Sequence, residues 1–322
     1  MNQKNIWRMY KLRNDYRRAC SLVERKIFHS THVVTTTKAG KTLIPAEKFD
    51  DYLRAKIASG QPLMVARYGS VEAGMIFQTL GVRTHAQGSI GHSFYSKLHL
   101  NAGFFPNEKS YVNRFVNLML EASKEIDVLC YWETGGQEYL ADFCCSDKTQ
   151  LTALDNLQPF WNKNTPWTAA LKGKKVLVIH PFAETIESQY RNRENIWKND
   201  LILPEFELHT LKAVQTIAGN KDERFEDWFQ ALDYMYSEAM KTDFDIAIIA
   251  CGAYGMPLAY RLKMAGKQAI HWGGMSQIWF GIKGARWDNN PRVNQFYNEY
   301  WVRPDTSETP KGKNGVEGGC YW

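Results

Sequence analysis

The chain has 322 residues, which is enough for two domains or for one large α/β domain with attached arms. Hydrophobic residues make up 44% and charged residues 23%, a balance that is typical of folded globular proteins and excludes an intrinsically disordered chain. No apolar stretch approaches the roughly 20 residues of a membrane-spanning helix, and residues 1–30 lack the apolar block of a secretory signal. We therefore expect a soluble, cytoplasmic protein.

The net charge of +6 lies at one end of the chain, because residues 1–30 carry an excess of six basic side chains and the rest is neutral overall. A nucleic-acid-binding protein usually has a basic face on its folded body, so this balance predicts no nucleic-acid partner. Apolar residues recur in the same segment near the helical period, which predicts a basic amphipathic helix. These residues are Ile6, Met9, Tyr16, Cys20, Val23 and Ile27.

The chain divides into an N-terminal helical arm (residues 1–44), an α/β domain (45–303) and a polar tail (304–322). The arm can pack on its own domain or on a second subunit. Alternatively, residues 1–30 can attach peripherally to an anionic membrane surface, where each basic side chain contributes about 1 kcal/mol. The tail is polar and contains glycine, so we expect it to be mobile. Six cysteines without a CxxC pair or zinc-site spacing indicate reduced thiols.

Short apolar blocks alternate with helical patterns along the central part of the chain. Continuous apolar blocks are typical of strands that are buried on both faces of a parallel sheet. The alternation predicts a doubly wound, mostly parallel α/β sheet of Rossmann type, in which ligands bind beyond the carboxyl ends of the strands. In chain order the predicted elements are strand 63–66, helix 71–79, helix 111–124, strand 126–131, strand 176–179, helix 184–197, helix 226–240, strand 245–250, helix 256–265 and strand 267–271.

The loop after the first predicted strand begins with Arg67 and Gly69. A glycine here allows a tight turn into a helix whose free amides can face a phosphate, and the arginine can add two hydrogen bonds. Glu72 falls in the first turn of that helix. It is either a functional carboxylate or a charge that complements the helix dipole.

The strand at 176–179 runs into His180, and Pro181 ends the strand because proline lacks an amide donor. His180 is a candidate general base or substrate hydrogen-bond donor, or else a structural histidine. Glu184 follows in the next helix and is the second candidate for the base.

Two glycine-rich turns follow the last two predicted strands. The first contains Gly252, Tyr254 and Gly255 and is suited to holding a phosphate. It lacks the full G-x-G-x-x-G pattern and the acidic residue that binds ribose, which disfavours a nicotinamide dinucleotide. The second turn adds five candidate residues, which are His271, Gly273, Gly274, Gln277 and Arg286.

Several of these segments resemble one known family. The loop RYGSVEA resembles the Arg-x-Gly-Asp-Gly-Glu motif that follows the first strand of the GT-D-fold glycosyltransferases. The segment DIAIIACGAYGMPLAYRLKMAGKQAIHWGG resembles their carboxyl-terminal strand, glycine turn, helix and strand, and HPFAETIESQY and FGIKGARWD fit the same pattern. The resemblance covers residues 45–290 at motif level. It implies a GT-D-like protein of a branch associated with cell-surface polysaccharides.

The resemblance also implies a nucleotide-diphosphate sugar as donor, and Mn²⁺ or Mg²⁺ held by an Asp-x-Glu element. By position the glutamate of that element is Glu72, and the aspartate is replaced by Ser70. Either Glu72 suffices with help from another acid such as Glu133, or arginine and glycine-turn amides neutralise the diphosphate without a metal.

The implied function is a glycosyltransferase that moves the sugar to a cytosolic glycan or glycolipid acceptor, such as a surface-glycan intermediate. His180 or Glu184 would deprotonate the acceptor hydroxyl, and Glu72 would hold the metal. The residues implied in donor binding are Arg67, Gly69, Ser70, Gly252, Tyr254, Gly255, His271, Gly273, Gly274, Gln277 and Arg286.

Two alternatives stay open at this point. Because Ser70 replaces the aspartate, the chain could be a catalytically silent GT-D-like module that binds a nucleotide or a glycan. A Rossmann-type methyltransferase or dehydrogenase is the other alternative, and it rests on the glycine turns alone.

Overall fold

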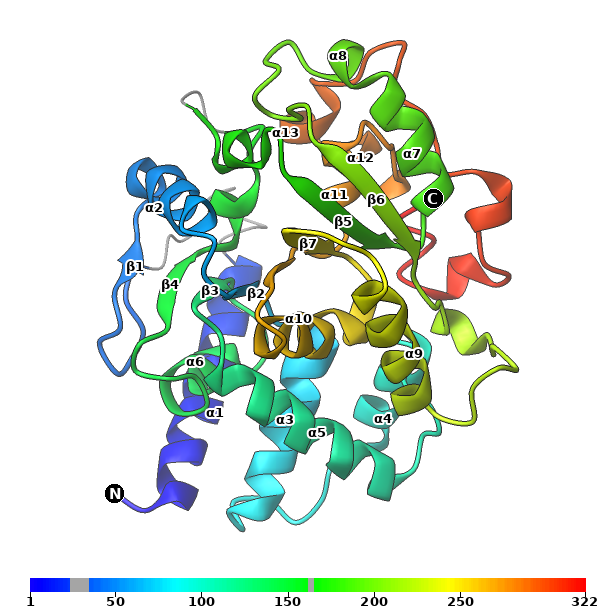
Figure 1. Cartoon of the computed structure of the whole chain (residues 1–322). Helices are drawn as coiled ribbons and strands as arrows, with labels where there is room; N and C mark the ends of the chain where they lie inside the picture. Colours follow the sequence, from blue (N-terminus) through cyan, green and yellow to red (C-terminus); the bar gives the residue numbers. More distant parts are fainter. Residues whose placement is uncertain (24–34, 162–164) are drawn as a thin grey trace.

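A single parallel sheet forms the centre of the molecule (Figure 1). The structure is a computed structural model that describes residues 1–23, 35–161 and 165–322. In these residues eight strands pair in the order β1-β4-β3-β2-β8-β7-β5-β6, all parallel, which confirms the predicted doubly wound α/β fold. The strands are β1 (Leu43–Ile44), β2 (Leu63–Ala66), β3 (Val128–Tyr131), β4 (Gln150–Ala153), β5 (Lys175–His180), β6 (Glu207–Lys212), β7 (Ile246–Ile249) and β8 (Gln268–His271).

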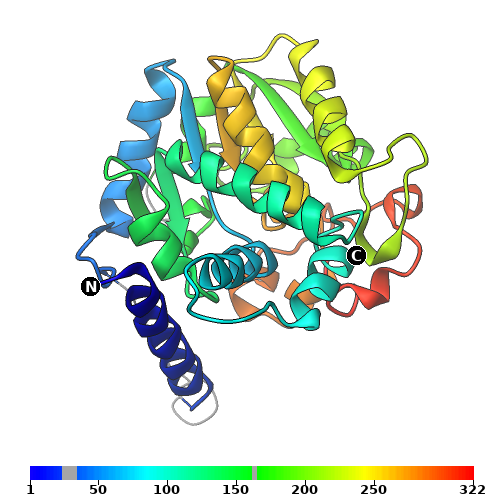
Figure 2. The ribbon, with the colours of Figure 1, turned by 90° about the horizontal axis from the view of Figure 1, so that it is seen from below.

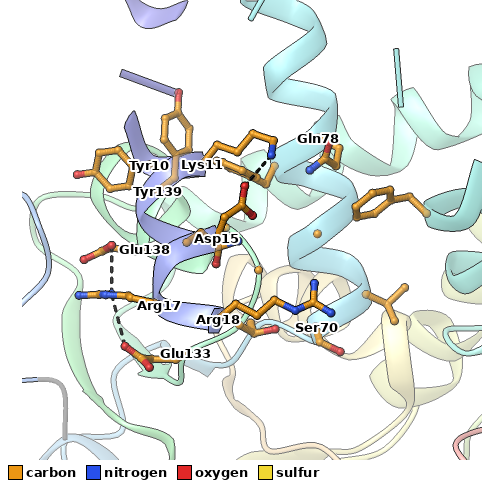
Figure 3. A pocket seen from close by; sticks show the side chains of 18 of the residues that line it. Tyr10, Lys11, Asp15, Arg17, Arg18, Ser70, Gln78, Glu133, Glu138 and Tyr139 are labelled. Atoms are coloured by element: carbon orange, nitrogen blue, oxygen red, sulfur yellow. Dashed lines mark hydrogen bonds and ion pairs between the residues drawn. The ribbon is translucent and has the colours of Figure 1, made fainter. Parts of the chain in front are cut away.

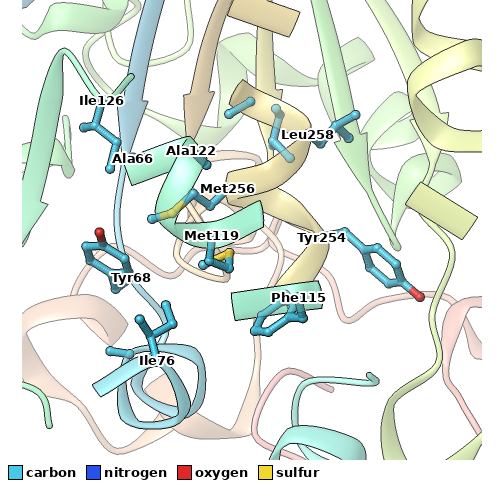
Figure 4. Packing of buried hydrophobic residues seen from close by; sticks show 14 of the residues in the cluster. Ala66, Tyr68, Ile76, Phe115, Met119, Ala122, Ile126, Tyr254, Met256 and Leu258 are labelled. Carbon is cyan, nitrogen blue, oxygen red and sulfur yellow. The ribbon is translucent and has the colours of Figure 1, made fainter. Parts of the chain in front are cut away.

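Side chains of the central strands alternate between two cores, one on each face of the sheet. In β2, Met64 and Ala66 belong to one core, and Leu63 and Val65 belong to the other. Figure 4 shows part of the first core, where α5 and α10 pack under the sheet. Helices on this face include α3 (Ser70–Arg83), α4 (His92–Leu100), α5 (Lys109–Lys124), α9 (Trp228–Met240) and α10 (Gly255–Met264). Those on the other face include α2 (Ala46–Ala58), α7 (Ala183–Arg191), α8 (Arg193–Ile196), α11 (Ser276–Trp279), α12 (Ala285–Asp288) and α13 (Pro291–Asn294).

All five predicted strands are present, but three further strands were not predicted. Strands β1 and β4 are short, and the edge strand β6 is polar and half exposed, so none of them shows a continuous apolar block. The helix predicted over 184–197 is two helices, α7 and α8, because the chain leaves helical geometry between them at Asn192.

The predicted N-terminal helix is present as α1 (Gln3–Val23), which extends from one corner of the molecule (Figure 2). It packs on its own domain mainly through Trp7 and Tyr10, which are buried. Ile6 and Met9 of the predicted apolar stripe are half-buried against the same core. Trp7 stacks on Phe77 of α3 with ring centroids 4.8 Å apart. Tyr16 of the stripe is 70% exposed, and Ile27 lies outside the described residues.

Part of the positive charge of α1 is neutralised by the domain. Arg13 and Arg17 pair with Glu138 at 2.9 Å and 3.2 Å, and Glu138 lies in α6 (Gln137–Phe143). These contacts favour the interpretation that the arm packs on its own domain, and attachment to a membrane surface stays a prediction. No helix in the described ranges is long and apolar enough to cross a membrane.

The C-terminal tail folds back onto the domain, so the expectation of a mobile tail is wrong for this structure. Val316, Cys320 and Trp322 are buried. The Glu308 carboxylate accepts hydrogen bonds from the backbone N–H groups of Glu184 and Thr185, at 2.8 Å and 3.2 Å. The polar composition of the tail conceals these few buried residues, which hold it in place.

Candidate active site

A cavity of about 120 Å³ lies beyond the carboxyl ends of the central strands. Its wall includes Arg67 after β2, His180 at the end of β5, Gly252 after β7 and Gly273 after β8. From β2 the chain continues to β3, whereas from β5 it continues to β6 at the opposite edge of the sheet. This reversal is where ligands bind in open α/β sheets, so the cavity is the candidate active site.

Seven of the residues predicted from the sequence line this cavity, and seven do not. The lining ones are Arg67, His180, Gly252, Tyr254, Gly273, Gly274 and Gln277. The others are Gly69, Ser70, Glu72, Glu184, Gly255, His271 and Arg286. Some residues of the second group lie close to the cavity without lining it. His271, for example, lies against Gly255.

Arg67 supplies a positive charge to the wall of the cavity. Its guanidinium lies against Gly273, where an added Cβ would overlap the guanidinium nitrogens. Gly273 also has a φ of +83°, which only glycine adopts freely. Arg67 forms no ion pair with a carboxylate in the part of the chain that the structure describes. A half-buried, unpaired arginine at the end of a central strand is suited to binding an anion.

Glu72 is buried beside the same loop, with its carboxylate folded over Gly69. Burial raises the pKa of Glu72, while its own backbone N–H and the charge of Arg67 lower the pKa in part. Ser70 begins α3 and lines a different, larger cavity. Glu133, the proposed helper acid, lines that larger cavity too and pairs with Arg17 at 3.5 Å.

The described residues contain no group of three or more His, Cys, Asp or Glu residues that could hold a metal ion. Protein side chains alone therefore do not form a complete site for a divalent cation in this part of the chain. A cation that bridges two phosphates needs only one or two carboxylates, because phosphate oxygens complete its shell. Glu72 is the carboxylate of this loop, but it does not line the cavity, so it could hold such a cation only after its side chain turned away from Gly69.

His271 is buried behind the cavity wall, against Gly255. Neither of its ring nitrogens has a hydrogen-bond partner among the described residues, although the backbone of Arg67 lies beside the ring. Burial and then the charge of Arg67 lower the pKa of His271 to about 3. The ring is therefore neutral at ordinary pH.

His180 is buried and lines the cavity. Its Nδ1 accepts a hydrogen bond from the Phe182 backbone N–H at 2.9 Å, and burial lowers the pKa of the ring to about 3. The proton of the neutral ring is then on Nε2, so His180 is a hydrogen-bond donor in this tautomer. Glu184 is exposed and pairs with Lys212 at 2.9 Å, and the fold does not bring it into the cavity.

The glycine turn after β7 is held by an aromatic pair. Tyr254 stacks on Trp228 with ring centroids 4.7 Å apart, and the Tyr254 and Thr216 hydroxyls share a hydrogen bond of 3.0 Å. Thr216 also lines the cavity. Gly252 has a φ of +61°, which lets the backbone turn directly at the end of the strand.

The tail closes the remaining side of the cavity. Tyr321 and Trp322 line it, and the Tyr321 ring occupies the space where Gly274 would carry a Cβ. Gln277 donates a hydrogen bond to the Tyr321 carbonyl oxygen at 3.0 Å. Arg286 pairs with Glu317 and contacts Cys320 Sγ at 3.1 Å. Two predicted donor-binding residues, Gln277 and Arg286, therefore hold the tail in this structure.

Sequence reasoning missed the tail aromatics and Thr216. Tyr321 and Trp322 end a segment whose polar composition hides them, although a Cys-Tyr-Trp cluster is itself a sign of burial. Thr216 follows β6, the polar strand that was not predicted, so no strand end marked it.

No family model and no curated protein matches the chain. Two solved structures match, each at 12% identity and covering 84% of this chain and 93% of its own. One is described as a selenomethionine structure of domain of unknown function 1792, with a TM-score of 0.44. The other has a TM-score of 0.42 and the description "The highly conserved domain of unknown function 1792 has a distinct glycosyltransferase fold". A likeness at this level does not transfer an activity to this chain.

Proposed function

We propose that the chain is a glycosyltransferase that uses a nucleotide-diphosphate sugar as donor. One observation carries this proposal: Arg67, which forms no ion pair with a carboxylate of the described residues, meets neutral hydrogen-bonding groups in a cavity at the carboxyl ends of the central strands. In sugar transfer the bond between the anomeric carbon and the diphosphate breaks, and negative charge develops on the departing diphosphate. A preorganised cation and donors aimed at that charge are the main catalytic requirement.

Each residue has a defined part in this proposal. Arg67 binds the diphosphate, His180 donates Nε2–H to a phosphate or sugar oxygen, and the Gly252 turn lets the phosphate approach the backbone. The acceptor hydroxyl attacks the anomeric carbon and gives up its proton. His180 as the base for that proton would require the proton to move from Nε2 to Nδ1, which breaks the hydrogen bond with Phe182.

Glu72 would be the carboxylate that holds a divalent cation such as Mn²⁺ or Mg²⁺, and such an ion would offset the negative charge of the diphosphate. The acceptor would be a glycan or glycolipid on the cytoplasmic side, for instance an intermediate of a surface glycan. The charge balance of the body gives no reason to propose a nucleic-acid partner.

The cavity is too small for the whole donor while the tail is in place. Its volume is about 120 Å³, whereas pockets for ligands of this size usually have about 300–1,000 Å³. We infer that the donor displaces part of the tail, in particular Tyr321 beside Gly274.

Thermal unfolding with nucleoside diphosphates and nucleotide sugars, with and without Mn²⁺, tests the proposal. One of them should raise the melting temperature of the wild-type protein, because a ligand at 100 times its Kd adds about 2.7 kcal/mol of stability. Arg67→Ala should weaken that binding at least about tenfold, since it removes charge-assisted hydrogen bonds. Arg292→Ala removes an exposed arginine that pairs with Asp155 and is the matched control. No shift with any nucleotide would contradict the proposal.

The second candidate is a catalytically silent binding module, which Ser70 in place of an aspartate and the absence of a described metal-binding group favour. A turnover assay distinguishes the silent module from the glycosyltransferase. Nucleotide binding that depends on Arg67, but without hydrolysis or transfer over a panel of acceptors with Mn²⁺ and Mg²⁺, would support the silent module.

A further inference from the structure

A larger cavity lies on the other side of the loop that carries Arg67. It has a volume of about 600 Å³ and lies between α1, α3, α4 and the loop from β3 to α6 (Figure 3). We call it the α1 groove. Ser70 lines the α1 groove, and Arg67, three positions earlier, lines the candidate donor cavity. A ligand in the groove would therefore lie next to a ligand in the donor cavity.

The acidic side chains of the α1 groove are already paired. Asp15 pairs with Lys11 at 2.8 Å, and Glu133 and Glu138 pair with Arg17 at 3.5 Å and 3.2 Å. Glu138 also pairs at 2.9 Å with Arg13, which lies outside the groove. Three basic side chains therefore offset the three carboxylates, which weakens their attraction for a cationic ligand.

Two basic side chains of the groove have no such partner in the part of the chain that the structure describes. Arg18 of α1 and Lys97 of α4 line the groove, and neither forms an ion pair within residues 1–23, 35–161 and 165–322. Figure 3 shows Arg18 reaching from α1 toward the start of α3, where Ser70 lies. As far as the described residues show, the groove is thus a polar space with two positive charges outside ion pairs, and its electrostatic complement is an anion.

The rest of the wall suits a saccharide. Phe94, Tyr131 and Tyr139 supply aromatic surface, and Asn14 and Gln78 supply amide groups. Aromatic rings cover the apolar faces of sugar rings while amides bind hydroxyl groups, which is the usual division of labour in a pocket for a polar ligand.

We propose that the α1 groove binds the acceptor, and that the acceptor is a saccharide carrying an anionic group that Arg18 and Lys97 recognise. This inference rests on the proposed function, because it assigns the second substrate of the same reaction. It also gives the basic arm a role, since α1 forms one wall of the groove and contributes Arg18.

Titration calorimetry with a uronic-acid tetrasaccharide, a neutral tetrasaccharide of equal length and inorganic phosphate tests the groove. The wild-type full chain should bind the acidic saccharide at least about tenfold more tightly than the neutral one. The double variant Arg18→Ala/Lys97→Ala should remove this preference. The control Lys48→Ala/Lys172→Ala removes two exposed lysines that do not line the groove, and it should keep the preference.

A second variant blocks the groove sterically. An added Cβ at Gly135, which lines the groove, meets no atom within 4 Å, so Gly135→Trp can fill the space without a clash at its Cβ. We expect this variant to lose saccharide binding and to keep the nucleotide-induced thermal shift. Gly88→Trp is the matched control, because Gly88 is equally open but lies outside the groove.

The outcomes separate the two proposals. The acceptor proposal would be contradicted if the protein bound nucleotide and saccharide, but neither the Arg18/Lys97 nor the Gly135 variant weakened saccharide binding. It would also be contradicted if the wild-type protein bound none of the saccharides. Phosphate binding without saccharide binding would overturn it as well. Saccharide binding that these variants abolish, without any nucleotide binding, would instead support the groove and contradict the glycosyltransferase.

Discussion

Glu72 carries a carboxyl group in a place where its charge is costly. It is 8% exposed, and its pKa is raised mainly because burial penalises the ionised form. A carboxyl group whose pKa is higher in the folded than in the unfolded state destabilises the fold at pH values above both pKa values. Such an unfavourable charge beside Arg67 and Gly69 is typical of a functional site.

Glu72→Gln should therefore raise the stability of the fold and lower the transfer activity. At pH 7 we expect a higher melting temperature than for the wild type, because the amide keeps the shape and carries no charge to desolvate. The two proteins should become equally stable below about pH 4, where the wild-type carboxyl is protonated too. Sugar transfer should fall by about 10²-fold or more.

The exposed Glu121→Gln is the control for this experiment and should change neither quantity. A Glu72→Gln variant that is less stable at pH 7, with transfer intact, would show that Glu72 has only a structural role at the start of α3.

Among the elements, the C-terminal tail has the most direct control over the donor cavity. Arg286, paired with Glu317, and Gln277, bonded to the Tyr321 carbonyl oxygen, fasten it beside Gly274. Nucleotide binding must compete with these contacts if the tail has to move.

Arg286→Gln should tighten nucleotide binding several-fold, while lowering the melting temperature slightly because the tail is less firmly held. Each lost contact is worth on the order of 1 kcal/mol, which corresponds to about fivefold in affinity. Isothermal titration with the nucleotide selected in the thermal panel measures the change. Arg292→Gln, which breaks an exposed ion pair with Asp155, should leave the affinity unchanged. Weaker nucleotide binding by Arg286→Gln would mean that the ordered tail is part of the donor site.

The central elements could be predicted from the sequence, and the peripheral ones could not. Strands β2, β3, β5, β7 and β8 have nearly or fully buried side chains, so their apolar blocks were visible. Strand β6 and the tail are fixed by partners far away in the sequence, such as Glu308 with Thr185. The local sequence pattern holds no information about such distant partners. For this reason the cavity residues at the strand ends were predicted, whereas the tail residues that close the cavity were not.

The same limit applies to individual residues. Arg67, His180 and Gly252 follow visible strands, and they do line the cavity. Glu184 lies close to His180 in sequence, but the direction of α7 turns it outward to Lys212. The sequence places a residue near a strand end, whereas the course of the helix decides where its side chain points.

For the molecule as a whole, the two buried histidines predict sensitivity to acid. His180 and His271 have pKa values lowered to about 3 by burial, whereas an unfolded chain has histidine pKa values near 6.5. The unfolded state therefore binds more protons between about pH 6.5 and 3, and stability is present above this window and lost as the pH falls through it.

Each of the two histidines should cost on the order of 2 kcal/mol of unfolding free energy between pH 7 and pH 5. Urea unfolding at the two pH values measures the loss. His271→Gln should reduce this pH dependence by about half, whereas the exposed His92→Gln should leave it unchanged. An unfolding free energy that stays constant from pH 7 to pH 5 would show that the rings are not buried in their neutral form.

The pairing at the middle of the sheet has a consequence for how the chain folds. Strand β2 pairs with β8, so that Leu63 lies beside Gln268, more than 200 residues later. During synthesis β2 exposes an open edge until β8, more than 200 residues later, has left the ribosome, and such long-range pairing makes folding slow. The carboxyl ends of β2 and β8 meet only then, so the Arg67 loop and its Gly273 neighbour come together late. Chaperone dependence and aggregation of fragments that lack β8 follow from this topology.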